Sequence, residues 1–182
     1  MTLSGKKLAI LVENLYEDLE FWYPYYRLKE EGADVTVVGT GSSQVYKGKH
    51  GLEAKPDVTV DHADPRDFDA VVIPGGYAPD YMRRYPALLE FVRETHRQGK
   101  VVAAICHAGW VLASAGLTEG LRMTCFSSIK EDVVNAGADY VDQAVVRDKN
   151  IITSRFPADL PLFCKEIIAA LEAQNIPPLK AA

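Results

Sequence analysis

The sequence lacks the features that define several classes of protein. It has three cysteines in 182 residues, at 106, 125 and 164, and no C-x-x-C pair. That spacing excludes a zinc ribbon and a dithiol redox motif. A sparse, odd set of cysteines is typical of a reducing compartment, so we expect a cytoplasmic protein with at least one free thiol. The N-terminal apolar run covers only residues 8–12, too few for a signal-peptide core or a membrane span.

Motifs for cofactors and charged partners are also missing. There is no phosphate-binding G-x-x-x-x-G-K-[ST] and no metal-ligand spacing, so we expect neither a cofactor nor a metal. The net charge of −5 argues against a broad surface for nucleic acid or membranes. With 48% apolar and 25% charged residues, the composition is that of a globular protein. At about 150 residues per domain, the length predicts one domain over residues 1–182, with a loose tail from about 175.

Apolar runs of strand length alternate with segments of helical spacing. Buried strands are predicted at 8–12, 34–39, 70–73 and 101–105. Helices are predicted at 15–31, 78–84, 86–98, 107–115, 129–135 and 158–173. Residues 45–60 predict a hairpin or edge excursion, 122–126 a short strand and 144–154 a hairpin. Repeated β-then-α units predict an α/β fold, a three-layer α/β/α sandwich around a mostly parallel sheet.

Three segments of this predicted sheet carry chemistry at the same edge. Functional sites in such sheets lie beyond the carboxyl ends of the strands. The segments that should meet there are 13–20, the turn Pro74-Gly75-Gly76, and the cysteine that follows residues 101–105. Their convergence follows from topology alone.

The cysteine at the end of a buried strand is the strongest candidate for a reactive group. Cys106 follows an apolar strand, and a helix is predicted to begin at His107. Backbone N–H groups and the helix dipole would stabilise a thiolate there, so we expect a nucleophile elbow with a low-pKa thiol. The alternative is a small buried apolar side chain, because free cysteine is among the most buried residue types.

Two further groups could complete that site. His107 could act as base or acid, although adjacent residues at a turn usually point apart. Its backbone N–H, with one from Gly75 or Gly76, would form an oxyanion hole. The alternative for Pro74-Gly75-Gly76 is a plain turn.

The four histidines are His50, His62, His96 and His107, and none follows His107. This order excludes the triads of α/β-hydrolases and class I glutamine amidotransferases, in which the histidine follows the nucleophile.

Four acids follow the first strand: Glu13, Glu17, Asp18 and Glu20. An acidic first helical turn would be favourable and would account for two or three of them. One carboxyl that points into the site and stays protonated would donate a hydrogen bond to the thiolate and lower its pKa.

Other conspicuous residues favour structural roles. Cys164 lies among apolar residues at helical spacing, which predicts core, and Cys125 is ambiguous. The aromatic run 21–26 contains Pro24, which predicts a kink or a late start of the first helix. We interpret this run as part core and part subunit interface.

Several motifs together resemble the PfpI branch of the ThiJ/PfpI superfamily, the DJ-one-like proteins, over residues 7 to about 171. They include Tyr16-Glu17-Asp18-Leu19-Glu20, Gly48-Lys49-His50-Gly51, Pro74-Gly75-Gly76, Ala78-Pro79-Asp80, Ala104-Ile105-Cys106-His107 and Thr153-Ser154-Arg155-Phe156-Pro157. The resemblance implies a flavodoxin-like sandwich with a reactive cysteine at Cys106.

The resemblance also implies roles for individual residues. Glu20 matches the carboxyl that hydrogen-bonds the thiol, and His107 matches the histidine of a Cys-His-acid triad. Asp80 matches the acid that a neighbouring subunit supplies in hexameric members. The chain departs from the pattern at Ala108-Gly109, where many members have Gly-Pro, and at Asp80, where a glutamate is usual. The shorter acid reaches less far, which weakens the prediction of an intersubunit triad.

The resemblance favours a stress-response protein built around a reactive cysteine. One hypothesis is a glyoxalase- or deglycase-like enzyme, a hydrolase or lyase acting on small reactive carbonyls or their adducts. A second is a redox-responsive protein whose Cys106 oxidises to a sulfinic acid. The alternative function is an intracellular cysteine peptidase with an intersubunit Cys-His-Asp triad. We expect a homodimer, and leave open whether dimers build a hexamer.

Overall fold

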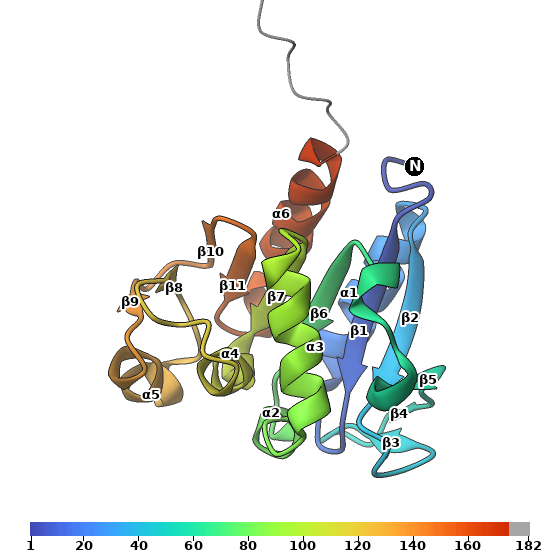
Figure 1. Cartoon of the computed structure of the whole chain (residues 1–182), viewed down its shortest axis with the longest axis horizontal. Helices are drawn as coiled ribbons and strands as arrows, with labels where there is room; N and C mark the ends of the chain where they lie inside the picture. The colour runs from blue at the N-terminus through green and yellow to red at the C-terminus, as the bar shows by residue number, and fades with distance from the viewer. Residues whose placement is uncertain (175–182) are drawn as a thin grey trace, which may run out of the picture.

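The computed structural model describes residues 1–174, and the loose tail predicted from about 175 lies outside the described residues. A seven-stranded sheet runs through the centre of the fold (Figure 1). In spatial order its strands are β10 (Val145–Asp148), β11 (Ile151–Ser154), β7 (Val101–Ile105), β6 (Ala70–Ile73), β1 (Lys7–Val12), β2 (Asp34–Gly39) and β5 (Val58–Thr59). Every neighbouring pair is parallel except β10 with β11, which forms the predicted hairpin.

Helices cover both faces of this sheet. They are α1 (Asp18–Glu30), α2 (Ala78–Met82), α3 (Pro86–Arg97), α4 (Gly109–Ser114), α5 (Lys130–Asn135) and α6 (Leu160–Ala173). Helices α1 and α6 pack against each other, whereas α3 packs on β6 and β7 and contacts α4 (Figure 1). The fold is therefore the predicted flavodoxin-like sandwich, with a mostly parallel sheet between two helical layers.

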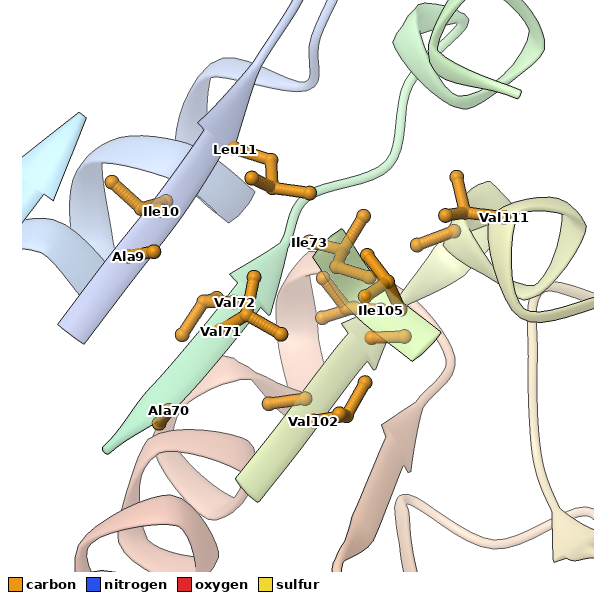
Figure 2. Packing of buried hydrophobic residues seen from close by; sticks show 14 of the residues in the cluster. Ala9, Ile10, Leu11, Ala70, Val71, Val72, Ile73, Val102, Ile105 and Val111 are labelled. Atoms are coloured by element: carbon orange, nitrogen blue, oxygen red, sulfur yellow. The ribbon is translucent and has the colours of Figure 1, made fainter. Parts of the chain in front are cut away.

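The three central strands form the core. Every residue of β6 and β7 is buried, as is every residue of β1 after Lys7. Such continuous apolar runs are typical of strands covered on both faces. Figure 2 shows side chains of these strands, among them Ile10, Val72 and Val102, filling the space between the layers. Each fully buried aliphatic side chain contributes roughly 1.5–3 kcal/mol, so the core holds the carboxyl ends of the strands rigidly.

The first helix starts later than residue 15, one of the two outcomes that Pro24 predicted. Leu15 has a φ of 63°, a left-handed conformation that cannot belong to a right-handed helix. Helix α1 begins at Asp18 and runs on through Pro24. Because proline has no N–H, Pro24 cannot donate to the carbonyl of Glu20, one turn earlier. Because β1 ends at Val12 and α1 begins only at Asp18, residues 13–17 form a loop, and this loop can line a site.

In two other segments, the observed strands differ in extent from the predicted ones. Residues 45–60 form a hairpin, β3 (Tyr46–Lys47) and β4 (Glu53–Ala54), followed by the edge strand β5. The strand predicted at 122–126 is shorter, because β8 (Arg122–Met123) pairs only with β9 (Asp139–Tyr140), outside the main sheet. No helix within residues 1–174 combines the length and the apolar character that crossing a bilayer requires.

Candidate functional site

The three predicted segments meet at the carboxyl edge of β1, β6 and β7. They surround a pocket of about 370 Å³. Its lining residues are Glu17, Glu20, Lys49, Gly76, Tyr77, Cys106, His107, Phe126, Ser128, Phe156 and Pro157. Residues from each of the three loops are among them, so the pocket lies where the strand topology predicts. Its wall is completed by segments far away in the sequence.

Cys106 occupies a nucleophile elbow. Strand β7 ends at Ile105, and residues Cys106–Ala108 form a 3₁₀ turn that leads into α4. The φ of Cys106 is 63°, in the left-handed region, which costs a non-glycine residue roughly 1–2 kcal/mol. Backbone strain of this kind persists where the surrounding structure imposes it, and it concentrates at functional sites. The turn directs the cysteine into the pocket while 7% of the residue stays exposed.

The His107 ring lies beside the thiol. Its Nδ1 is 3.2 Å from Cys106 Sγ, so these adjacent side chains do not point apart. The Phe126 ring stacks on the imidazole at 5.1 Å between centroids, and the Trp110 ring meets it edge-on at 5.1 Å. These two aromatic contacts hold the ring on the side of the sulfur. Burial lowers the pKa of His107, and the positive charge of Lys49 adds to this effect, so a neutral imidazole is favoured.

Glu20 supplies a buried carboxyl at the base of the site. The residue is fully buried, and its Oε2 accepts a hydrogen bond of 2.8 Å from the Gly75 N–H. Within residues 1–174, its Oε1 has no hydrogen-bond partner. Burial raises the pKa of Glu20 from 4.5 to about 8, since a charged carboxylate loses its hydration there. Glu20 is therefore predominantly protonated at neutral pH and can donate a hydrogen bond.

Gly75 fits between these groups because it has no side chain. A Cβ at this position would lie 2.6 Å from both Cys106 Cβ and Glu20 Oε2. The Gly75 N–H is taken by Glu20, which removes it as an oxyanion donor. The N–H groups of Gly76 and His107 lie against Cys106 instead and lower its pKa. Of the two predicted glycine donors, only Gly76 is available.

The expectation of a low-pKa thiol needs correction. Burial is the largest influence on Cys106 and raises the pKa of its thiol, and an ionised Glu20 raises it further. The N–H groups of Gly76 and His107 act in the opposite direction without overcoming burial. Because Glu20 is mostly protonated at neutral pH, the contribution of its charge is largely removed under those conditions. The site therefore favours a thiol that loses its proton to a neighbouring group over a standing thiolate.

The prediction that an acidic first helical turn accounts for two or three of the four acids is confirmed, because Asp18 and Glu20 lie in the first turn of α1 and Glu17 stands at its N-cap. All four are buried, at 3–7% exposure for Glu13, Glu17 and Asp18 and 0% for Glu20. Asp18 accepts hydrogen bonds from the N–H groups of His50 and Leu52, at 2.8 and 3.0 Å, and fastens the β3–β4 loop. Glu17 pairs with Lys49 at 2.8 Å. Oxygen and nitrogen atoms of Glu17, Asp18 and His50 also lie within 4.8 Å of one another, but these existing contacts already use both carboxylates.

Asp80 lies away from the pocket that contains Cys106. It is half-buried on α2, pairs with Arg84, and lines a separate surface cavity with Tyr77, Tyr81, Trp110 and Leu15. Within residues 1–174 no hydrogen bond or ion pair joins Asp80 to the His107 ring, whose partners are Cys106 and Ser128. Its role as an acid supplied by another subunit stays a prediction.

The remaining sequence features divide between core and surface. Cys125 and Cys164 are each 1% exposed, which confirms the core prediction for Cys164 and places Cys125 in the interior as well. In the aromatic run, Phe21 is fully buried, whereas 38% of Tyr23 and 62% of Tyr26 are exposed. The core part of that interpretation is confirmed. The subunit-interface part stays a prediction.

Sequence reasoning gave no site role to six pocket residues: Lys49, Tyr77, Phe126, Ser128, Phe156 and Pro157. Lys49 and the Phe156-Pro157 pair stand inside motifs of the resemblance, which is a signal that could have marked them. Ser128 stands in none of those motifs. Its only local signal is a short polar pair before a predicted helix, and this pattern is common in plain turns.

Comparisons with known proteins agree with this fold. The family model of the DJ-1/PfpI family matches residues 6–170. Deglycase PH1704 of Pyrococcus horikoshii is 42% identical over 91% of this chain and 99% of its own length. General stress protein 18 of Bacillus subtilis is 38% identical over 92% and 99%. A two-domain crystal structure from Anabaena variabilis, with DJ-1/ThiJ/PfpI-like and ferritin-like domains, is 46% identical with a TM-score of 0.91; the match covers 98% of this chain and about half (52%) of that one. The chain belongs to the DJ-1/PfpI family.

Proposed function

We propose that this protein is a cysteine-dependent enzyme of stress protection that acts on small reactive carbonyls or their adducts, as a deglycase or glyoxalase does. One observation carries the proposal: the Cys106 sulfur lines a pocket of about 370 Å³ with His107 Nδ1 3.2 Å away. The nearest carboxyl, Glu20, has a pKa of about 8, so at neutral pH it is mostly uncharged and offers little repulsion to a forming thiolate. A nucleophile and its base are thus adjacent in a small pocket.

The first chemical step follows from these positions. His107 Nδ1 takes the proton of the Cys106 thiol as a sulfur lone pair forms a C–S bond at the carbonyl carbon. The C=O π bond breaks, and its electrons move to the oxygen. The N–H groups of Gly76 and His107, which lie against the sulfur, would stabilise that developing oxyanion. The oxygen then takes the proton back from Nδ1, which gives a neutral hemithioacetal and restores the imidazole.

Two relatives support the choice of activity by their names. Deglycase PH1704 and General stress protein 18 are both matched over 99% of their length. The size of the pocket agrees, because about 370 Å³ is near the small end of ligand pockets. A peptide would need a longer groove, and Asp80 lies in a separate cavity. These observations favour a small carbonyl substrate over the peptidase alternative.

The test is methylglyoxal consumption by the purified protein and its Cys106→Ala variant. We expect the variant to lose nearly all activity. Cys164→Ala is the matched control, because Cys164 is also buried but lies on α6 and does not line the pocket. Equal consumption by the native protein and Cys106→Ala would reject the proposal.

A redox role is the second candidate, favoured by the hydrogen-bond donors around the sulfur. Two molecules of hydrogen peroxide would convert the Cys106 thiol to a sulfinic acid and leave two of water. The N–H groups of Gly76 and His107 and the protonated Glu20 would then bind the sulfinate oxygens. Mass spectrometry after mild peroxide should find oxygen mainly on Cys106. Oxygen spread over Cys125 and Cys164 would reject this role.

A further inference from the structure

We infer that Ser128 positions His107 for proton transfer with Cys106, and so fills, within one chain, the place that an acid from another subunit would take in a Cys-His-acid triad. This inference rests on the proposed function, in which His107 is the base. It assigns a positioning role to a residue that no sequence motif singled out.

The two ring nitrogens of His107 face two different partners. Nδ1 lies 3.2 Å from Cys106 Sγ, and Nε2 lies 3.1 Å from Ser128 Oγ. To receive the thiol proton, Nδ1 must be unprotonated. The proton of the neutral ring is then on Nε2, which donates it in a hydrogen bond to Ser128 Oγ. The Ser128 hydroxyl can accept this hydrogen bond, so the contact is compatible with the tautomer in which His107 is a base toward the sulfur, and we infer that Ser128 holds the ring in that tautomer.

The segment that carries Ser128 is tied to the elbow. Ser128 lies in a 3₁₀ turn, Ser127–Ile129, that leads into α5. Just before this turn, the Phe126 N–H donates to the Cys106 carbonyl at 3.3 Å, and just after it Ile129 is 1% exposed. The hydroxyl is thus held between an anchor on the elbow and an anchor in the core. Its distance to the imidazole is set by the fold, although Ser128 itself is exposed.

A serine at this position differs chemically from the acid of a Cys-His-acid triad. A hydroxyl oxygen is a neutral acceptor, so it orients the imidazole but stabilises an imidazolium less than a carboxylate would. Burial and Lys49 also disfavour the imidazolium. His107 would therefore hold the thiol proton briefly and return it to the carbonyl oxygen. The Ser128 hydroxyl also occupies the ring nitrogen that an acid such as Asp80 would need.

The experiment compares Ser128→Ala, Ser128→Thr and Ser127→Ala in the full-length protein. Ser127 is the matched control: it is exposed in the same turn, and within residues 1–174 its hydroxyl makes no hydrogen bond. One readout is the ¹⁵N chemical shifts of the His107 ring, which report the tautomer directly. The other is the rate of Cys106 alkylation by iodoacetamide at pH 7, followed by mass spectrometry.

In Ser128→Ala we expect the tautomer with hydrogen on Nε2 to lose its predominance and alkylation to slow by roughly three- to tenfold, the effect of one hydrogen bond. Ser128→Thr should restore both, and Ser127→Ala should change neither. Unchanged shifts and alkylation in Ser128→Ala would overturn the inference. So would an Asp80→Asn variant that shows the same losses while Ser128→Ala does not.

The outcomes separate this inference from the proposed function. If Cys106→Ala consumes methylglyoxal as fast as the native protein, the proposed function fails, and the ring shifts still report whether Ser128 sets the tautomer. If Cys106→Ala is inactive but the tautomer and alkylation rate of Ser128→Ala match those of the native protein, only the role of Ser128 fails. Circular dichroism of each variant shows that the comparison is between folded proteins.

Discussion

Replacing Glu20 by glutamine should change how the stability of the protein depends on pH. Glutamine keeps the shape of a protonated glutamate: its carbonyl can accept from the Gly75 N–H, and its amide can donate toward Cys106. It cannot ionise. Burial raises the pKa of Glu20 to about 8 because it destabilises the charged carboxylate. In Glu20→Gln there is no charged form, so this contribution to the pH dependence of stability is absent.

The sign and size of the effect follow from linkage. The folded protein keeps the Glu20 proton up to about pH 8, whereas the unfolded chain releases it near pH 4.5. Stability from this group is therefore fully present below pH 4.5 and is lost as the pH rises toward 8. At about 1.4 kcal/mol for each pH unit, the native protein should lose roughly 3–4 kcal/mol relative to Glu20→Gln between pH 5 and pH 8.

Urea denaturation of both proteins at pH 5 and pH 8, at one protein concentration, measures this difference. Glu131→Gln, an exposed glutamate on α5, controls for the loss of one negative charge at the surface. The same pair of measurements in a Cys106→Ser background removes titration of the thiol. Parallel stability curves for the native protein and Glu20→Gln would show that Glu20 is ionised in the folded state, and would refute the reasoning.

Two other substitutions test the backbone of the site. Gly75→Ala should destabilise the protein by roughly 1–3 kcal/mol in chemical denaturation, because its Cβ would overlap Cys106 and Glu20; an unchanged midpoint would contradict the packing described. Cys106→Gly should be more stable than Cys106→Ala by about 1 kcal/mol, because only glycine adopts a φ of 63° without strain. That difference corresponds to a melting temperature roughly 2–4 °C higher, and an alanine variant of equal or greater stability would argue against strain at the elbow.

The sandwich was predictable because its signals are local. The buried strands are continuous apolar runs, and their ends carry turn residues such as Pro74-Gly75-Gly76. The strand ends then meet at one edge for topological reasons, which predicted that Cys106 and the loop before α1 would share a site. The length of β8 was harder to predict, because its pairing with β9 depends on a distant segment.

The chemistry of the site was less predictable, because it depends on burial and on contacts between distant segments. The acids before and within α1 appear equivalent in the sequence, but only Glu20 approaches the sulfur, while Asp18 and Glu17 fasten the β3–β4 loop. The low pKa expected for Cys106 rested on the helix dipole and the backbone N–H groups alone. In the folded chain 7% of that residue is exposed, and desolvation outweighs the N–H donors.

By itself, the sequence determined the order of strands and helices, the elbow at Cys106 and the edge of the sheet where a site would lie, because hydrophobic periodicity and turn residues act over short distances. Only the tertiary structure decided which groups surround the sulfur. It brought Ser128 to His107, gave the Gly75 N–H to Glu20 and kept Asp80 in another cavity. Those outcomes depend on packing between distant segments, since Ser128 is 21 residues from His107 and Gly75 is 55 residues from Glu20, and no local pattern encodes them.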